Sequence, residues 1–412
     1  MSFITPSRKD RFYNAVFFLN SVLVFWYFSN SIVGNTSPAT SLLAALAIIF
    51  IVPVCRYFPA LWKGQKLWIA ALAVFGAYHI VHLFMEGVET SEDYETPAKA
   101  IAAILIFGYL MKYGFSVYMV GYAIALSTLA AGGYAIYEKF YLGLERAGSL
   151  SHPIRYGYLV FTLAVLSCFF AWFAEKKQER YAFYIVGMIG IVGAFTTGTR
   201  GLVIITGFLL LLLCLNRKVL NYLSWKKVAL AVGCFALLVV TLASQTNVLN
   251  RYIDSTVREF EFIESGNFNT SIGFRLMMWD TALYLGSKHP VLGVGHDQDK
   301  IIAESSGFIQ DNGYNPNILT EYNHFHNQYL DAFAKDGVIG VLAWCFLLVA
   351  ALIGLKTKYR YAVIIIVTTL AIGGLTEVVL RSSRLFYLLV LGISIFRCMD
   401  YFEYKRIKDS AS

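Results

Sequence analysis

The sequence predicts an all-α polytopic membrane protein with about twelve transmembrane helices. Of the 412 residues, 58% are hydrophobic and only 15% are charged, whereas a soluble domain carries about 25% charged residues. The apolar residues fall in repeated blocks of roughly 16 to 22, the length that a helix needs to cross a bilayer. One long polar segment interrupts this pattern. We therefore expect a single integral membrane domain over residues 1–412, with residues 245–336 as a large helical extracytoplasmic loop between helices 9 and 10.

The expected spans follow the apolar blocks, and the connections on the cytoplasmic side are short. Connections of about 5 to 12 residues cannot hold a nucleotide-binding fold, since one strand–helix–strand unit needs about 30 residues. The sequence also has no glycine-rich phosphate-binding loop, so an activated donor would have to come from the membrane or from outside. The twelve expected spans are residues 12–33, 40–55, 67–85, 98–112, 115–137, 157–174, 181–197, 201–216, 228–244, 337–355, 361–379 and 384–397.

The distribution of charge predicts the orientation. The net charge is +8, but Lys and Arg lie in short clusters between spans, which is typical of cytoplasmic loops and not of a nucleic-acid-binding surface. Residues 245–336 instead contain twelve acidic and six basic residues, so we expect this loop on the outer side and no nucleic-acid partner. The clusters expected in the cytoplasm are Arg56/Lys63/Lys66, Lys176/Lys177/Arg180, Arg217/Lys218/Lys226/Lys227, Lys356/Lys358/Arg360 and Arg397/Lys405/Arg406/Lys408.

The first half of the loop is expected to form two helices. Residues 250–265 alternate charged and apolar side chains, which predicts an amphipathic helix lying on the bilayer. A second helix is expected from Ser271 to just before Gly286. The second half is expected to begin with a turn-rich return over residues 289–296 and to stay irregular to about Ile318.

A last loop helix is expected just before the tenth span. Asn323 can cap a helix from about His324 to Lys335, and Gly337 would end it. This arrangement would place His326 in the first turn of that helix.

Several arginines at the outer membrane edge are candidates for binding an anion. Arg200 follows Thr196-Thr-Gly-Thr between two apolar runs, where it either extends to the interface or, with the neighbouring hydroxyls and the next helix start, binds an anion. Arg275 lies on an otherwise apolar helix, so it needs either a carboxylate, Asp280 or Glu321, or a ligand phosphate. Arg381 and Arg384 form a third candidate site, with pairing to Glu377 or interfacial anchoring as the alternative.

Histidines supply the candidate base. A neutral imidazole is the usual general base for activating a hydroxyl, and His326 is our candidate. The alternative is a helix-start histidine bonded to backbone. His324 and His326 could also be two metal ligands, but no third ligand at a suitable spacing is evident, so we predict no metal site and no cofactor. We interpret His79 and His82, one helical turn apart, as a satisfied buried pair or part of a polar cavity.

Several sequence motifs, in order, resemble the family of bacterial O-antigen ligases and related polysaccharide polymerases. The resemblance covers roughly residues 180–400, and the first half of the chain matches only in hydropathy. It is carried by Thr197-Gly-Thr-Arg200-Gly, Ser271-Ile-Gly-Phe-Arg275 with Trp279, His289-Pro-Val-Leu-Gly-Val-Gly, and His326-Asn-Gln-Tyr-Leu-Asp-Ala-Phe-Ala-Lys-Asp-Gly337-Val-Ile-Gly.

The resemblance implies a metal-independent, inverting glycosyl transfer at the periplasmic face of a Gram-negative inner membrane. The donor would be O-antigen on undecaprenyl pyrophosphate, and in a ligase the acceptor would be a sugar hydroxyl of lipid A–core. His326 would deprotonate the acceptor, although His324 nearby leaves the choice of base open. Arg200 and Arg275 would bind the pyrophosphate and stabilise the departing charge. We also place Arg381, Arg384, His324, Asn327 and Trp279 among the substrate-binding residues.

Two other functions compete with the ligase. A polymerase of the same family would use another lipid-linked glycan as acceptor, and the motifs do not encode the acceptor. A transporter of lipid-linked glycan would favour charged residues inside several spans and paired halves of the chain. The charges here gather at one outer rim and no repeat is visible, which favours the enzyme. Its expected partners are the two glycolipids and the surrounding membrane lipids.

Overall fold

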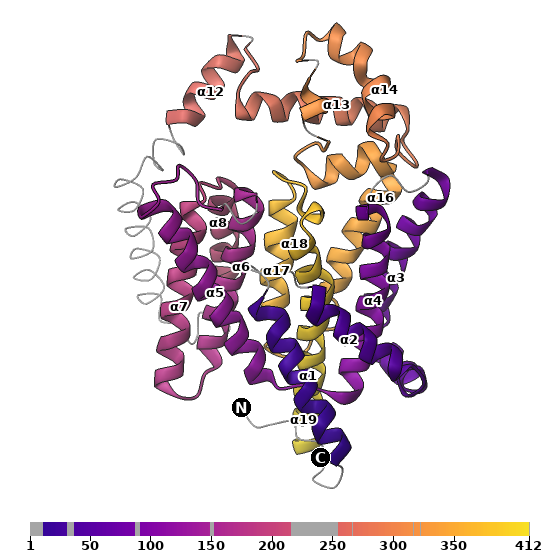
Figure 1. Ribbon diagram of the computed structural model, residues 1–412, viewed down its shortest axis with the longest axis vertical. Helices are drawn as coiled ribbons and strands as arrows, with labels where there is room; N and C mark the ends of the chain where they lie inside the picture. The colour runs from indigo at the N-terminus through magenta and orange to yellow at the C-terminus, as the bar shows by residue number, and fades with distance from the viewer. Residues whose placement is uncertain are drawn as a thin grey trace.

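The molecule is a bundle of long helices with a layer of shorter helices over one end (Figure 1). The computed structural model describes residues 11–30, 37–86, 91–148, 152–215, 254–265, 267–315, 317–321 and 323–411. All regular elements among these residues are helices. They are α1 (Arg11–Ser29), α2 (Ser37–Ile49), α3 (Ile51–Glu86), α4 (Ser91–Tyr113), α5 (Val117–Phe140), α6 (Pro153–Phe173), α7 (Lys177–Thr196), α8 (Gly201–Leu215), α12 (Asp254–Glu264), α13 (Ser271–Lys288), α14 (Gln298–Asp311), α15 (Ile318–Glu321), α16 (Gln328–Leu352), α17 (Arg360–Gly373), η1 (Val379–Arg381), α18 (Ser383–Tyr387), η2 (Leu388–Gly392) and α19 (Ile393–Ala411).

The helices are those of a multi-pass membrane protein, but fewer than twelve qualify as spans. Within the described ranges, six helices are long and apolar enough to cross a membrane, or up to seven if a bent pair counts as one span. Gly201–Leu212 and Arg360–Gly373 are apolar but shorter, and a helix needs about 20 residues to cross. The expected ninth span, residues 228–244, lies outside the described residues.

The expected span at residues 40–55 is not one straight helix. Pro38–Ile49 and Ile51–Trp62 meet at an angle of 90°. Pro53 explains the position of the break, because its ring clashes with the carbonyl of the residue four positions earlier, Ile49, and it cannot donate a hydrogen bond to that carbonyl. The sequence pattern missed this bend because both halves are equally apolar.

Basic clusters gather at the end of the bundle away from the loop helices. Lys358 Nζ lies 3.0 Å from Glu403 Oε1 and 4.8 Å from the ring centroid of Phe173. The start of α17, the end of α6 and the last helix α19 therefore meet at one end, and α12–α14 lie at the other (Figure 1). This separation agrees with the orientation that the charge distribution predicts.

The loop folds on a small apolar core of its own. Thr270 caps α13 by accepting a hydrogen bond from the Gly273 backbone N–H, which confirms the helix expected there, although α13 continues through Gly286 to Lys288. The expectation of an irregular stretch after residue 296 is wrong, because α14 forms with Asp297 as its cap. The asparagines of this stretch follow α14, whose own sequence combines the Asp297 cap with an apolar face. The core of the loop consists of Met277, Met278, Ala282, Leu285, Val294, Ile301, Ile309, Leu319, Phe325 and Ala334.

The turn at residues 289–296 is bonded directly to the backbone of α16. Val294 and Gly295 donate to the carbonyls of Ala334 and Lys335 at 2.8 and 2.9 Å. Gly293 has a φ of 72°, and a Cβ there would lie 2.1 Å from the Lys335 carbonyl carbon. Only glycine permits both this conformation and this close approach. The turn therefore holds the loop in a fixed register on α16.

The helix before the tenth expected span begins later than predicted but ends at the predicted glycine. Its cap is Asn327, and α16 starts at Gln328, not at His324 with Asn323 as cap. Gly337 is non-helical, with a φ of 66° and a ψ of −164°, and separates two helical parts of α16, which confirms that the loop helix ends at this glycine. A Cβ on Gly337 would lie 2.3 Å from the Val291 carbonyl oxygen, so the break makes room for the turn that packs against it.

Candidate active site

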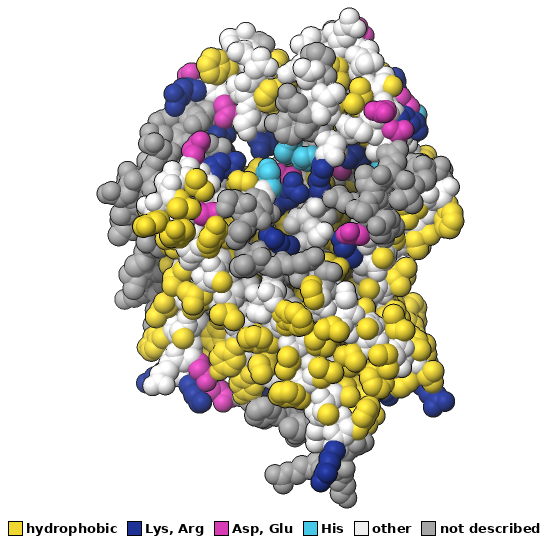
Figure 2. All heavy atoms as spheres, in the orientation of Figure 1, with side chains coloured by type: hydrophobic (Ala, Val, Ile, Leu, Met, Phe, Trp, Pro, Cys, Tyr) yellow, Lys and Arg dark blue, Asp and Glu magenta, His cyan; other side chains and the backbone are white. Residues whose placement is uncertain are grey.

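A buried carboxylate, Glu377, is the centre of the polar cluster beneath the loop helices. It lies beyond the end of α17 and its side chain is fully buried. Its Oε1 is 3.4 Å from His324 Nε2, and its Oε2 is 3.3 Å from His326 Nδ1. Histidine and Lys/Arg side chains gather in a recess between the loop helices and the hydrophobic belt of the bundle (Figure 2). The two histidines of the sequence motif therefore share one carboxylate.

Glu377 remains ionised at neutral pH. Burial opposes its ionisation, but hydrogen bonds from His324 and His326 and the charge of Arg155 hold the pKa of Glu377 well below its ordinary value. Arg155 Nε lies 4.0 Å from Oε1, and His152 Nδ1 lies 3.9 Å from Oε2. Four basic side chains thus surround a single carboxylate.

Contacts on both ring nitrogens fix the protonation of His324. Arg381 Nη1 lies 2.8 Å from Nδ1, and because a guanidinium only donates, Nδ1 must accept. The proton of a neutral ring then lies on Nε2, which faces Glu377. Burial lowers the pKa of His324, in keeping with a neutral ring. Both nitrogens are engaged, so His324 is poorly placed to act as a base.

His326 has the complementary arrangement. Its Nδ1 faces Glu377, so Nδ1 carries the proton and Nε2 is the nitrogen with a lone pair. Its φ of 48° is the single positive value among the described residues other than glycine, and such backbone strain is concentrated at functional sites. The expectation that His326 lies in the first turn of a helix is wrong, since it precedes the cap residue. Its strained turn directs the ring toward the carboxylate.

Asn327 has a structural role. Its Oδ1 accepts from the backbone N–H groups of Tyr329 and Leu330 at 3.0 and 3.2 Å. Its Nδ2 donates to the Leu375 carbonyl at 3.1 Å. The amide that we expected to bind substrate is therefore used to start α16 and to connect it to the turn that carries Glu377.

Arg275 and Trp279 lie one turn apart on α13. Arg275 Nη1 donates to Ser271 O and Oγ at 2.9 and 2.8 Å, while Asp280, one of its two expected partners, accepts from Tyr314. Burial lowers the pKa of Arg275, and the charge of Glu377 opposes this. Nε of Arg275 and Nε1 of Trp279 are buried and, among the described residues, have no hydrogen-bond partner. Two buried donors without acceptors suit an anionic ligand.

Arg200 lies in the turn between α7 and α8 and pairs with an unexpected carboxylate. Its Nη2 is 2.8 Å from Glu259 Oε1 on α12, and Glu259 Oε2 accepts from the Ile272 backbone at the start of α13. The hydroxyls expected to bind an anion beside it are bonded within the protein, with Thr197 Oγ1 and Thr199 Oγ1 2.7 Å apart. Arg200 therefore connects the bundle to two loop helices.

The two arginines near the last span differ in their contacts. Arg381 donates to Asn323 Oδ1 and to His324 Nδ1. Arg384 Nη1 is buried and has no hydrogen-bond partner among the described residues. The expected alternative was that these arginines pair with Glu377. In the structure, histidines and Arg155 contact the Glu377 carboxylate instead.

Sequence reasoning gave Glu377 only a minor role. It appeared as a possible partner of Arg381 and Arg384, although an acidic residue at the end of an expected span is itself a functional signal. His152 and Arg155, at the start of α6, were not singled out at all. Their sequence signal is weak, since a histidine before a proline at a helix start has many structural explanations.

His324, His326 and Glu377 could also hold a metal ion. Their donor atoms lie within 4.8 Å of one another, so the structure supplies the third ligand that the sequence did not reveal. However, Arg381 lies 2.8 Å from His324 and Arg155 lies 4.0 Å from Glu377. Two guanidinium groups beside the ligands oppose binding of a further cation. The electrostatics favour a carboxylate–imidazole pair over a metal centre.

The site is expected to lose stability on acidification. Burial lowers the pKa of His152 to about 4, although Glu377 opposes the shift, and histidine in an unfolded chain has a pKa of about 6.5. Within this pH interval the unfolded chain therefore binds more protons than the folded chain, so the free energy of unfolding decreases as the pH falls. We expect the Tm of the detergent-purified protein to be at least about 2 °C lower at pH 5 than at pH 7.5. The difference should shrink in His152→Gln, and an equal difference in both proteins would contradict this assignment.

Comparison with known proteins shows what part of this chain is similar to. Residues 185–345 match the family model described as O-antigen ligase. A protein of Haemophilus influenzae, described as uncharacterized, is 24% identical over 316 residues, which cover 74% of this chain and 76% of the relative. The matched segment contains Arg200, Arg275, His324 and His326. By this match, residues 185–345 are similar to the O-antigen ligase family.

Proposed function

We propose that the protein is an O-antigen ligase of the Gram-negative inner membrane. It transfers glycan from undecaprenyl pyrophosphate to a sugar hydroxyl of lipid A–core, at the periplasmic face and without a metal in the chemical step. The observation that carries the proposal is the pairing of His326 with the buried Glu377. Residues 245–336 then serve as lid and catalytic segment of one membrane domain.

The surroundings of this pair support a pyrophosphate donor. Arg275 lies close enough to Glu377 and Arg200 for both charges to affect its pKa. Its Nε and the indole nitrogen of Trp279 are buried donors without partners among the described residues. Pyrophosphate offers several charged oxygen acceptors, and guanidinium groups bind such oxygens with two parallel hydrogen bonds.

The chemical step follows from the tautomer of His326. Glu377 accepts a hydrogen bond from Nδ1–H of His326, and Nε2 removes the proton from the acceptor hydroxyl. The acceptor oxygen attacks the anomeric carbon from the face opposite the pyrophosphate, whose C–O bond breaks with both electrons passing to the leaving group. Arg275 and Arg200 stabilise the negative charge that develops there. The proton on His326 then passes to the lipid pyrophosphate or to solvent, and the anomeric configuration is inverted.

Arg275→Lys is expected to slow transfer by about 10- to 100-fold, because lysine keeps the charge but loses the planar fork. The loss should appear in kcat and in the affinity for donor. The matched control is Arg258→Lys on α12, a more exposed arginine of the same loop, which should leave transfer near the wild-type rate. Equal rates in wild type and Arg275→Lys would exclude a role of Arg275 in binding the leaving group.

The function is tested by reconstitution. Purified protein is mixed with glycan on undecaprenyl pyrophosphate and with purified lipid A–core, with and without Mg²⁺, and the product is separated by size. A ligase yields glycan-bearing lipid A–core at the same rate in both buffers. Lengthened glycan on the lipid carrier would indicate a polymerase, and movement of the donor across vesicles without either product would indicate a transporter.

Deletion in cells separates the same functions. Loss of a ligase leaves lipid A–core without O-chain and strands long glycan on the carrier. Loss of a polymerase leaves lipid A–core with a single repeat unit. We expect the first pattern, restored by wild type but not by His326→Ala.

A further inference from the structure

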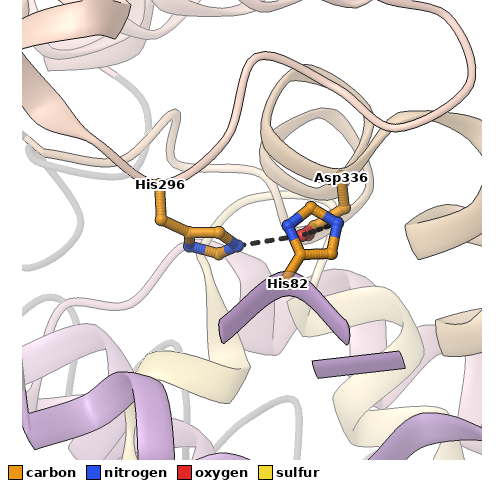
Figure 3. A group of neighbouring side chains, drawn as sticks. All are labelled: His82, His296 and Asp336. Carbon is orange, nitrogen blue, oxygen red and sulfur yellow. Dashed lines mark hydrogen bonds and ion pairs between the residues drawn. The ribbon is translucent and has the colours of Figure 1, made fainter. Parts of the chain in front are cut away.

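A second group of ionisable side chains lies where the loop meets the bundle. It consists of His82 near the end of α3, His296 in the turn before α14 and Asp336 on α16. Figure 3 shows the His296 ring pointing at the carboxylate of Asp336, with the His82 ring beside it. These residues come from three distant parts of the chain, and the proposed transfer reaction uses none of them.

The distances within this group are those of ligands around one ion. His296 Nε2 and His82 Nε2 lie 2.8 and 3.9 Å from the same oxygen, Oδ1 of Asp336, and all three donor atoms lie within 4.8 Å of one another. With zinc–ligand bonds of about 2.0–2.1 Å, tetrahedral ligands are about 3.3 Å apart. The observed values bracket this separation. A distance of 3.9 Å is too long for a hydrogen bond, so His82 and the Asp336 carboxylate are close neighbours that are not directly hydrogen-bonded to each other.

We propose that His82, His296 and Asp336 bind a divalent transition metal, with Zn²⁺ as the expected ion, and that this ion fastens the loop to the bundle. Two imidazoles and one carboxylate are a recurrent zinc ligand set, completed by water or another oxygen. The side chain of His296 is 39% exposed, which gives the ion a path of entry.

The fold arranges two of these ligands independently of the third. Gly295 donates its backbone N–H to the Lys335 carbonyl, so the residues just before His296 and Asp336 are bonded to each other. His82 is supplied by α3, which packs along α16. An ion at this point would therefore connect a preformed loop–helix unit to a neighbouring helix, and would restrict movement of the loop over the site.

A neighbouring hydroxyl gives the proposal a discriminating variant. Tyr78 Oη lies 2.6 Å from His82 Nε2 and donates to the Asp336 carbonyl at 3.2 Å. It therefore competes with an ion for the same nitrogen. Tyr78→Phe is expected to bind zinc at least as well as wild type. If these residues formed only a network of hydrogen bonds, the same variant would lose a contact and would bind no zinc.

The test measures zinc in the full-length protein, purified in detergent with a tag that contains no histidine. The protein is equilibrated with ZnCl₂, desalted, and analysed by inductively coupled plasma mass spectrometry. Wild type, Tyr78→Phe and the control His289→Gln should retain about one zinc per chain. His296→Ala and Asp336→Asn should lose it. His289 is a suitable control because it is a loop histidine that pairs with Glu304 instead.

A second measurement checks the structural consequence. Zinc should raise the Tm of wild type and of His289→Gln, and should leave the Tm of His296→Ala unchanged. Absence of zinc from wild type, unchanged zinc in His296→Ala and Asp336→Asn, or loss of zinc in His324→Ala instead would each overturn the proposal. Neither readout involves glycan transfer. These measurements can therefore contradict the metal site without contradicting the proposed ligase, and a transfer assay can contradict the ligase without contradicting the metal site.

Discussion

His326→Ala is expected to reduce the rate of glycan transfer by about 10²- to 10⁴-fold, the usual contribution of a general base. In the structure, Glu377 faces Nδ1 of His326, which leaves Nε2 to take the proton of the acceptor hydroxyl. Alanine removes that acceptor without altering the arginines that bind the donor. The loss should therefore appear in kcat, with the KM for lipid-linked glycan close to that of wild type. Initial rates at several donor concentrations, with saturating lipid A–core, measure both constants.

Two histidine controls make this result specific. His289→Ala removes a loop histidine that pairs with Glu304 and should leave transfer close to wild type. His324→Ala should reduce the transfer rate by an intermediate amount. His324 connects Arg381 to Glu377, but both of its ring nitrogens are engaged in these contacts, so it does not act as the base. If His324→Ala abolished transfer while His326→Ala retained most of it, the assignment of the base would be reversed.

Glu377→Gln is expected to reduce transfer by an amount on the order of 10²- to 10⁴-fold, as replacement of the orienting carboxylate in other carboxylate–histidine pairs does. Glutamine has the same shape, but its amide N–H₂ can face Nδ1 of His326 and favour the wrong tautomer. The donor-binding arginines are retained, so kcat should fall more than the affinity for donor. Glu377 thus acts as a positioning residue.

A double variant separates this role from a structural one. If Glu377 acts through His326, then adding Glu377→Gln to a protein that already carries His326→Ala should reduce the transfer rate little further. Independent, multiplicative losses would contradict the coupling. The matched control is Glu304→Gln, which changes a carboxylate paired with a different loop histidine and should leave transfer nearly unchanged. A thermal melt of each variant confirms that it is folded.

Local patterns in the sequence were sufficient for the loop helix α13 but not for α14, nor for the contacts between the loop elements. The helix at α13 could be predicted because Thr270 and Ser271 precede a continuous helical pattern. The true cap of α16 could not, because both Asn323 and Asn327 are good caps, and the choice depends on the bond from Asn327 Nδ2 to Leu375. That contact joins residues 48 positions apart in the chain.

The contacts of charged residues could not be predicted from the sequence either. The sequence placed Arg397 in a basic cytoplasmic cluster, yet the structure buries it, where it donates to the Ala350 and Ala351 carbonyls at the end of α16. The cluster still predicts the same orientation, because that prediction depends on the number of charges. Whether one arginine reaches water or caps a helix depends on which helix lies beside it.

The sequence by itself determined that this chain is helical and has several helices apolar enough to cross a membrane, and it predicted that the motifs resembling those of O-antigen ligases lie at one outer rim. These properties follow from side-chain hydropathy, charge counts and short spacings, all of which act locally. Only the tertiary structure decided that Glu377 joins His324 and His326, and that His82, His296 and Asp336 meet at a second point. Such groups form when helices distant in the chain pack together, and their ionisation depends on the burial and neighbouring charges that this packing creates.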